Sequence, residues 1–444
     1  MQRHRLRATF SSTLLLAGLV SGACVQVEDP FHVDEPSDCS EASKKQFVVD
    51  VMGEFYLWNA DLPADVDISG YETPEQLVAD LRVGNDRWSR VSDKATSDAL
   101  FMDGKFVGLG YKTDRGPDDE VRLSFVSDNS PASGAGLQRG DVILAVNGKT
   151  VAELDETGWS GIYGDNDPGV EVEIEIERFA TGVVETIHLT KDWIDIVSLP
   201  VVEVLDGPGG EPIGYFVMDK FVETTKDELE AAFAQFKAAG ASKIIVDLRY
   251  NGGGLISVAE RLVNLAVGAD HAGSVAYRFT YNSNYSSQNS TTSISKLSNS
   301  IGADEIIVLT SSRTLSASEL VINALIPYAN VTLVGSDTGG KPVGSKGFDF
   351  CDKKLYPITF RLENAFGATD YFDGLSADCW AEDDLFHQLG DPNEGMLAAG
   401  LAALAGSCAE LPAPAAPLGL RAKVDAVGER VLPDADLRDE IDSW

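Results

Sequence analysis

Apolar strands and amphipathic helices alternate through the second half of the chain. Short apolar runs that predict strands occur at 213–218, 243–248, 305–310 and 331–335. Between them, apolar residues recur every three or four positions, which predicts helices over about 225–239, over about 255–266 and from Ser316 onward. This alternation is typical of an α/β core, in which helices cover a mostly parallel sheet.

The first half of the chain shows two other patterns. A helical apolar stripe follows Asp38, and a second short helix is predicted at 74–81, where proline occupies the first turn. Short strands separated by glycine-containing turns begin at Phe106. The runs 106–111, 121–127, 130–137 and 140–148 together resemble a PDZ domain.

These patterns divide the chain into six segments. We expect a signal peptide at 1–24, a linker at 25–36, a helical N-terminal domain at 37–100, a PDZ-like domain at 104–190, an α/β domain at 193–408 and a tail at 409–444. Residues 281–300 are rich in serine and asparagine, so a surface loop is expected there.

Composition narrows the choice of partners. The 444 residues suffice for two or three domains, each with its own core. The formal charge is −35, with 70 acidic against 35 basic residues. Such a chain repels phosphate groups, so nucleic acid and anionic membrane surfaces are disfavoured as partners. A solvated acidic surface accounts for the excess charge.

The N-terminus has the pattern of an export signal. Arginines at positions 3, 5 and 7 precede an apolar run at 13–20, which is too short to span a membrane. The sequence Val20-Ser21-Gly22-Ala23-Cys24 resembles a bacterial lipoprotein signal, with serine where leucine is usual. We therefore expect lipidation of Cys24 and a periplasmic or outer-membrane lipoprotein of a bacterium. Cleavage after Ala23 without lipidation is the alternative.

The cysteine count agrees with export. If Cys24 carries lipid, four cysteines are left, an even number that suits disulfides in an oxidising compartment. They are Cys39, Cys351, Cys379 and Cys408. We expect Cys351 to pair with Cys379, although the sequence alone does not fix the connectivity.

Ser316 lies where a predicted strand ends and a helix begins. Backbone N–H groups at such a junction are unpaired, and the helix dipole favours negative charge there. A serine at this position can attack a carbonyl group and hold the resulting oxyanion. The structural alternative is a helix cap, because Ser316 and Glu319 also fit the Ser-x-x-Glu capping box.

Two other stretches strengthen the catalytic interpretation. Three glycines, Gly252 to Gly254, follow the strand at 243–248 and could bring backbone N–H groups close to a ligand. Lys341 follows the strand at 331–335 and comes 25 residues after Ser316. A lysine acts as a general base only when burial lowers its pKa.

Together these stretches resemble the catalytic core of the C-terminal processing, or tail-specific, serine peptidases of family S41. The matching motifs are Asp247-Leu248-Arg249-Tyr250-Asn251-Gly252-Gly253-Gly254, Ser316-Ala317-Ser318-Glu319 and Gly340-Lys341. The resemblance implies that Ser316 is the nucleophile and Lys341 the base. It also implies an oxyanion hole made by the N–H of Ala317 and that of Gly253 or Gly254. Many members have Gln or Glu four residues after the lysine to orient it, whereas this chain has Ser345.

The same resemblance carries expectations about fold and substrate. It implies a crotonase- or ClpP-like α/β catalytic domain, an inserted PDZ-like domain and a small helical N-terminal domain. The substrates would be exported polypeptides cut near their C-termini, and no cofactor is implied. In the PDZ-like domain, Gly108-Leu109-Gly110 could bind a terminal carboxylate, and the adjacent strand edge could take a peptide. The oligomeric state is left open.

Several other functions fit parts of the sequence less well. Residues 335–341 fit the start of a phosphate-binding loop, but Pro342 provides neither hydroxyl nor N–H. A Ser-His-Asp triad would need one of the four histidines that follow the expected signal peptide, none of which lies in a motif tied to Ser316. An acyl-CoA enzyme of the crotonase type is disfavoured by export, and no Cys/His cluster at metal-ligand spacing occurs. A catalytically inactive, PDZ-bearing binding scaffold is the main alternative. The four histidines are His32, His188, His271 and His387.

Overall fold

The computed structural model describes residues 30–408. The export signal, Cys24 and the tail at 409–444 lie outside the described residues, as does the first part of the linker. The contacts of the chain divide it at Asp34 into two units, and the elements described below belong to the second.

A six-stranded sheet carries the α/β domain. Its order is β10-β11-β12-β15-β16-β21, and β10 alone runs antiparallel to its neighbour. The central strands are buried on both faces, which explains their continuous apolar sequences. The strands are β10 (Val201–Asp206), β11 (Pro212–Val217), β12 (Lys243–Asp247), β15 (Glu305–Thr310), β16 (Asn330–Gly335) and β21 (Cys379–Trp380).

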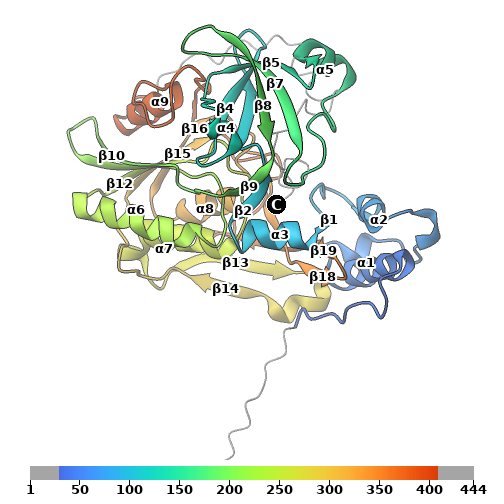
Figure 1. Ribbon diagram of the computed structural model, residues 1–444. Helices are drawn as coiled ribbons and strands as arrows, with labels where there is room; N and C mark the ends of the chain where they lie inside the picture. The colour runs from blue at the N-terminus through green and yellow to red at the C-terminus, as the bar shows by residue number, and fades with distance from the viewer. Residues whose placement is uncertain (1–29, 409–444) are drawn as a thin grey trace, which may run out of the picture. The chain divides into compact units, whose positions relative to one another are not determined.

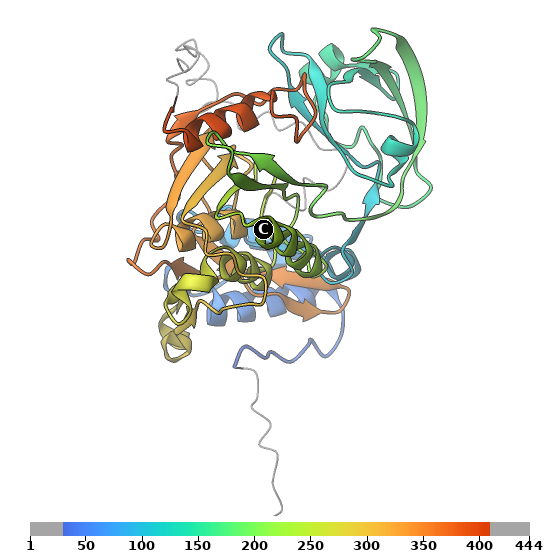
Figure 2. The same cartoon turned by 90° about the vertical axis from the view of Figure 1, so that its left-hand side faces the viewer.

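Helices cover both faces of this sheet. One face packs against α6 (Thr225–Ala239), α7 (Ile256–His271) and α8 (Ala317–Leu325), and the other against α9 (Gly395–Leu404). In Figure 1, α6 and α7 lie below the strands and α9 lies above them, and Figure 2 shows the same layers from the side. The expected α/β architecture of this part of the chain is confirmed.

A second sheet stands beside the helical layer. Its order is β14-β13-β20-β17, made of β14 (Ser290–Ser293), β13 (Val275–Tyr281), β20 (Ile358–Glu363) and β17 (Val343–Ser345). The expected surface loop at 281–300 is therefore partly regular, because it contains the 3-10 helix η3 (Ser283–Gln288) and the edge strand β14. Serine and threonine supply hardly any apolar alternation in β14, so the sequence pattern gave no sign of a strand.

The N-terminal region pairs with and packs against strands from the last third of the chain. This region has α1 (Glu41–Phe55), η1 (Asn59–Asp61), η2 (Ile68–Gly70), α2 (Pro74–Leu81), β1 (Arg90–Asp93) and α3 (Lys94–Phe101). Strand β1 pairs with β19 (Lys353–Tyr356), which pairs in turn with β18 (Phe348–Phe350). Phe47 of α1 stacks on Phe350 of β18, with ring centroids 4.9 Å apart.

The predicted Cys351–Cys379 disulfide is wrong. Cys351 bonds instead to Cys39, and Cys379 bonds to Cys408, with Cα–Cα distances of 5.9 and 5.5 Å. Cys351 lies in the turn between β18 and β19, directly after the strand that packs on α1, whereas Cys379 lies in β21 of the central sheet. The pairing follows from these two separate sheets, which sequence spacing does not reveal.

The PDZ part of the chain has its own sheet and core. Strands β3 (Tyr111–Arg115), β4 (Val121–Val126), β5 (Val142–Val146), β7 (Glu171–Glu177) and β8 (Val184–Thr190) follow one another in the sheet, and β6 (Lys149–Thr150) pairs with β5. Helices α4 (Pro131–Gly134) and α5 (Val151–Thr157) complete it. A two-stranded ribbon of β2 (Lys105–Gly108) and β9 (Asp192–Asp195) joins it to the rest of the chain.

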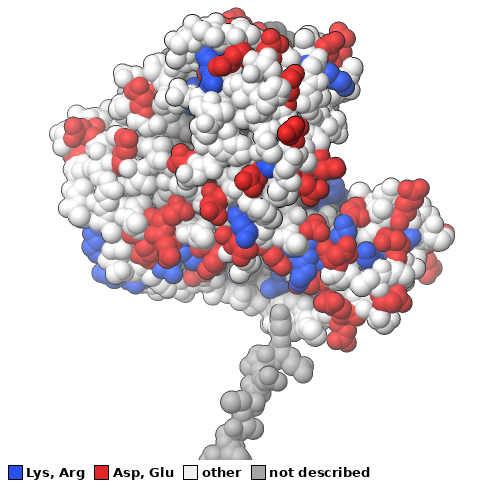
Figure 3. Space-filling view, in the orientation of Figure 1, with Lys and Arg blue, Asp and Glu red and all other residues white. Residues whose placement is uncertain are grey.

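The surface agrees with the acidic composition. Acidic side chains are spread over the face shown in Figure 3, with fewer basic side chains among them. Between residues 30 and 408, no helix combines the length and the apolar character needed to cross a membrane.

Candidate active site

Ser316 is held at the start of α8 by a strained, well-anchored turn. Its φ is +59°, a left-handed conformation that is uncommon outside glycine and often occurs at functional sites. Hydrogen bonds to the stretch after β12 fix this turn. Thr314 Oγ1 donates to the Leu248 carbonyl at 2.9 Å, and the Leu315 N–H donates to the Asn251 carbonyl at 3.2 Å. The serine is half-buried.

The glycine-rich loop lies directly against this turn. Gly253 and Gly254 have φ values of +106° and +136°, which other residues rarely adopt. A Cβ on Gly253 would lie 2.9 Å from Ser316 Cβ and 3.0 Å from Ala317 N, and one on Gly254 would lie 2.3 Å from the Phe221 carbonyl oxygen. Glycine is therefore required for this close approach.

The two glycines differ as oxyanion donors. The Gly253 N–H already donates to Asn251 Oδ1 at 2.8 Å. Among residues 30–408, no hydrogen bond uses the N–H of Gly254 or that of Ala317, which occupies the first position of α8. Of the two expected partners for Ala317, the geometry thus favours Gly254.

Lys341 is buried in the loop that follows β16. Its side chain is 2% exposed, and its Nζ lies 5.7 Å from the ring centre of Trp88. Gly340 has φ +83°, and a Cβ there would lie 2.3 Å from the Phe372 carbonyl oxygen. Burial lowers the pKa of Lys341 well below its usual range, and Arg90 adds to this, while Asp86 and Glu319 act in the opposite direction.

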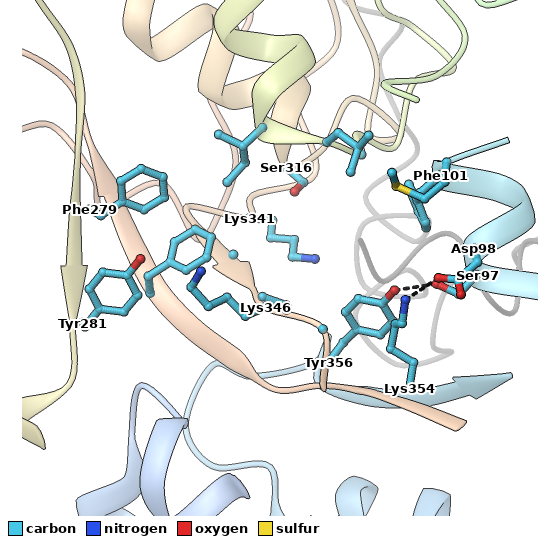
Figure 4. A pocket seen from close by; sticks show the side chains of 18 residues that line it. Ser97, Asp98, Phe101, Phe279, Tyr281, Ser316, Lys341, Lys346, Lys354 and Tyr356 are labelled. Atoms are coloured by element: carbon cyan, nitrogen blue, oxygen red, sulfur yellow. Dashed lines mark hydrogen bonds and ion pairs between the residues drawn. The ribbon is translucent and has the colours of Figure 1, made fainter. Parts of the chain in front are cut away.

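One cavity of about 430 Å³ contains both Ser316 and Lys341. Figure 4 shows the two side chains pointing into it, between Phe279 and Tyr281 on one side and an ionic cluster close to Phe101 on the other. In that cluster Lys354 binds Asp98, and Ser97 shares a hydrogen bond with Tyr356. Its apolar lining is Phe101, Met102, Leu255, Ile256, Phe279 and Phe360, with Tyr281 beside them.

Glu319 joins the serine turn to the lysine loop. Its carboxylate is fully buried and accepts four hydrogen bonds. One oxygen accepts from the N–H of Ser316 at 2.9 Å and that of Lys341 at 2.7 Å. The other accepts from the N–H of Gly340 at 2.8 Å and the hydroxyl of Thr338 at 2.5 Å. Burial raises the pKa of Glu319, and these hydrogen bonds offset part of that effect.

From the sequence, the one contact predicted for Glu319 is that of a helix cap. The cap contact exists, since Glu319 accepts from the Ser316 N–H, but it is one of four. The same contacts argue against a phosphate loop at 335–341. The N–H groups of Gly340 and Lys341, which such a loop would point at phosphate, are occupied by this carboxylate.

Ser345 lies in the same cavity, but the structure does not link it to the lysine. Its hydroxyl is buried and makes no hydrogen bond within the described part of the chain. Trp88 lies near the Lys341 amine instead, and no chemistry is predicted for it from the sequence. No histidine is among the described residues that line the cavity.

The aspartate and arginine of the first motif have a structural role. Arg249 is 1% exposed and binds Asp247 and Glu394 through its guanidinium group. It also donates to Asp383 at 2.8 Å. Although burial raises the pKa of Asp383, Arg139 and Arg249 hold it at about 2. This ionic cluster fixes the strand end from which the glycine-rich loop starts.

The expected carboxylate loop of the PDZ part is buried. Gly108, Leu109 and Gly110 are all inaccessible, and a Cβ on Gly110 would lie 2.1 Å from Ser130 Cβ. The Leu109 carbonyl accepts from the N–H of Ala132 at 2.9 Å. Carboxylate binding at this loop is therefore still a proposal.

Comparison with known proteins defines the class of the molecule. The family model "Peptidase family S41" matches residues 212–362, the S41 N-terminal domain model matches 43–90, and a PDZ domain model matches 124–178. The three matches lie in the order N-terminal domain, PDZ domain and peptidase domain, which is the domain order expected from the sequence. The expected resemblance to peptidase family S41 is thus confirmed over residues 212–362 and 43–90.

Characterised relatives carry related names. A carboxyl-terminal-processing protease of Picosynechococcus sp. PCC 7002 is 27% identical over 65% of this chain and 67% of its own length. The carboxy-terminal processing protease CtpA of Bacillus subtilis is 27% identical over 57% of this chain and 51% of its own length. The chain thus spans about half the length of some of these relatives.

A solved structure shares the fold. It is from Bacteroides fragilis NCTC 9343 and is assigned to the S41 proteases. It is 24% identical, covers 81% of this chain and 97% of its own, and superposes with a TM-score of 0.66.

Proposed function

We propose that this protein is a serine endopeptidase in which Ser316 is the nucleophile and Lys341 the general base. The observation that carries the proposal is the shared cavity, in which a half-buried serine on a strained turn meets a buried lysine. Glu319 ties the backbones of both residues together. A buried lysine with a lowered pKa can be neutral near neutral pH, as a base must be.

The chemistry runs in two halves. Lys341 Nζ takes the proton of the Ser316 hydroxyl as Oγ attacks the peptide carbonyl carbon, and the carbonyl oxygen becomes an oxyanion. Lys341 then gives that proton to the leaving amine, and the C–N bond breaks to leave an ester on Ser316. Water attacks the ester carbonyl and gives a proton to Lys341; the bond to Ser316 Oγ then breaks, and Lys341 returns the proton to Oγ as the carboxylic acid product leaves.

The oxyanion would be held by two backbone donors. The N–H groups of Ala317 and Gly254 are the available pair, since that of Gly253 is engaged by Asn251. Ala317 also starts α8, where the helix dipole favours negative charge. Removing one donor of this kind typically costs about 10²–10³ in kcat.

The proposed substrates are exported polypeptides that are cut near their C-termini. The names of the relatives support this choice, and the lining of Phe279, Phe360 and Ile256 suits apolar side chains beside the scissile bond. The PDZ domain would recognise the terminal carboxylate. Lipidation of Cys24, with a periplasmic or outer-membrane location, completes the proposal, and no cofactor takes part.

Cleavage of an unfolded protein and of short peptides tests the proposal. Ser316→Ala and Lys341→Ala should each abolish cleavage, while thermal unfolding shows that the fold is retained. Lys341→Arg should also be nearly inactive, because a guanidinium group stays charged. Amidating a peptide C-terminus should weaken its cleavage if the PDZ domain reads the carboxylate. A wild-type protein that cleaves nothing, yet binds peptides, would instead be the inactive scaffold.

A further inference from the structure

A segment of the N-terminal domain packs near Lys341, although its residues 86–90 do not line the cavity. Trp88 is 3% exposed, and its ring centre lies 5.7 Å from Lys341 Nζ. The ring also stacks on Phe372, with centroids 6.3 Å apart. Since the Phe372 carbonyl packs against Gly340, the indole and the lysine loop are held by the same neighbour.

Arg87 fastens this segment to the lysine loop directly. Its guanidinium group donates to the Gly339 carbonyl at 3.2 Å and to the Phe372 carbonyl at 3.3 Å. The carboxylate of Asp86 accepts from the N–H groups of Trp88 and Ser89, both at 2.9 Å. Tyr56 donates to the Asp86 carboxylate at 2.8 Å and the N–H of Ile358 to Ser89 Oγ at 2.9 Å, so both ends of residues 86–89 are anchored.

Arg90 brings a second positive charge to the same place. It is 8% exposed, and its guanidinium carbon lies 4.8 Å from the ring centre of Tyr356, which lines the cavity. Arg90 and Tyr356 are paired across strands β1 and β19. A fixed arginine beside a lysine disfavours the protonated lysine, because two like charges repel strongly in a dry site.

We propose that Trp88 and Arg90 are positioning residues of the peptidase site, which hold the Lys341 amine in a dry, uncharged state facing the cavity. The proposal rests on the Ser316/Lys341 mechanism. It gives the N-terminal domain the task that a Gln or Glu at position 345 would have in related enzymes. Burial is the largest cause of the lowered pKa of Lys341, and Arg90 is the second.

Other charged groups oppose or complete this effect. Asp86, on the same segment, and Glu319, on α8, both favour the protonated lysine. Each carboxylate is already engaged by at least three donors, which reduces its pull on the amine: Tyr56, Trp88 and Ser89 for Asp86, and Ser316, Thr338, Gly340 and Lys341 N–H for Glu319. Across the cavity, Lys346 adds positive charge, and Lys354 is paired with Asp98.

The indole has two opposing effects on the lysine. An aromatic face attracts an ammonium group, but 5.7 Å is close to the limit of about 6 Å for this attraction. Its larger effect is to exclude water, which lowers the pKa of a lysine. A smaller side chain at position 88 should therefore admit water and make Lys341 easier to protonate.

The test is the dependence of kcat/KM on pH for peptide cleavage by the full chain. For Arg90→Gln, the limb that rises with pH should move to higher pH, while the activity plateau above it is retained. Activity below the limb then falls about tenfold for each pH unit of the shift. Arg90→Lys, which keeps the charge, should leave the limb close to that of the wild type.

Trp88 provides an independent pair of variants. Trp88→Ala should move the limb in the same direction, and Trp88→Phe, which keeps an aromatic cover, should restore it. Arg261→Gln is the matched control, because Arg261 lies on α7, pairs with Glu230 and does not line the cavity. Its limb should not move.

Labelling gives a readout that needs no catalysis. In Ser316→Ala protein, an amine-reactive reagent should modify Lys341 at lower pH than other lysines, and Arg90→Gln should narrow that difference, as followed by mass spectrometry. Equal lowering of activity at every pH, with an unmoved limb and unchanged labelling, would overturn the proposal and leave Trp88 and Arg90 a structural role. If Lys341→Ala is active, the dyad itself is wrong.

Discussion

Replacing Glu319 by glutamine is the sharpest test of how the site is held together. The change keeps the size and shape of the side chain but removes its charge and one of its two acceptor oxygens. We expect a protein that folds, is less stable and cleaves peptides slowly. The physical reason lies in the four donors that converge on this carboxylate.

The magnitude follows from which donors lose their acceptor. If the amide oxygen stays toward the N–H groups of Ser316 and Lys341, the amide nitrogen faces Gly340 and Thr338. The Thr338 hydroxyl can turn and accept, whereas the Gly340 N–H cannot. One unsatisfied buried donor costs about 1–3 kcal/mol, and hydrogen bonds to a charged group contribute about 1 kcal/mol more than neutral ones. Relief of the buried charge offsets part of this, so we expect a loss of about 2–4 kcal/mol.

Activity should fall further than stability alone explains. The N–H groups of Gly340 and Lys341 donate to Glu319, and these hydrogen bonds hold the loop that carries Lys341. If they weaken, the loop moves and the base is misplaced relative to Ser316. A displacement of about 1 Å at a reacting group can cost about 10²-fold in rate. We therefore expect kcat to fall by about that factor, with KM little changed.

Urea denaturation and peptide kinetics measure the two effects. Glu228→Gln is the control, since the half-buried Glu228 also accepts from two backbone N–H groups, those of Ser198 and Leu199, yet does not line the cavity. It should lose stability and keep kcat. If the free energy of unfolding of Glu319→Gln stays within about 0.5 kcal/mol of the wild-type value and kcat is unchanged, Glu319 does not hold the serine turn and the lysine loop together.

Two further predictions concern stability. Because the folded-state pKa of Lys341 lies below its ordinary value of 10.5, the unfolded chain binds the additional proton as the pH falls, which destabilises the fold. Lys341→Met should then raise the free energy of unfolding at neutral pH by about 1.4 kcal/mol for each unit by which the folded-state pKa of Lys341 is lowered. This stabilisation should vanish near pH 10.5. If urea denaturation shows a stabilisation that grows with pH, the burial argument is refuted. Serine in place of both Cys39 and Cys351, which are 312 residues apart, should cost about 5–6 kcal/mol, against about 3–4 kcal/mol for Cys379 and Cys408, 29 apart. Equal losses in thermal unfolding would contradict this order.

The sequence predicts best what is local. The apolar runs of β12, β15 and β16 define buried parallel strands, and their ends place the glycine-rich loop, Ser316 and Lys341 at one edge of the sheet. Parallel strands bring their carboxyl ends together, so three distant motifs meet without any long-range information.

What the sequence misses depends on contacts between remote segments. Glu319 fits a helix cap, and nothing in its surroundings shows that Gly340 and Lys341 will also donate to it. The same holds for Trp88, whose place near Lys341 is set by a β1–β19 pairing across more than half of the chain. The cysteine count was informative, but the partner of Cys351 was decided by that same pairing.

The pairing of β1 with β19 also bears on the order in which the chain gains activity. Ribosomes release the N-terminal helices first, yet Arg90 finds its partner Tyr356, and Cys39 finds Cys351, only after most of the later residues have followed. Contacts this far apart in sequence form late and slowly in folding. An incomplete chain therefore lacks the packing of Trp88 and Arg90 near Lys341, even when the turn that carries Ser316 has already formed. On the proposed mechanism, a nascent chain would be unable to cleave neighbouring proteins, so this topology would postpone peptidase activity until the chain is complete.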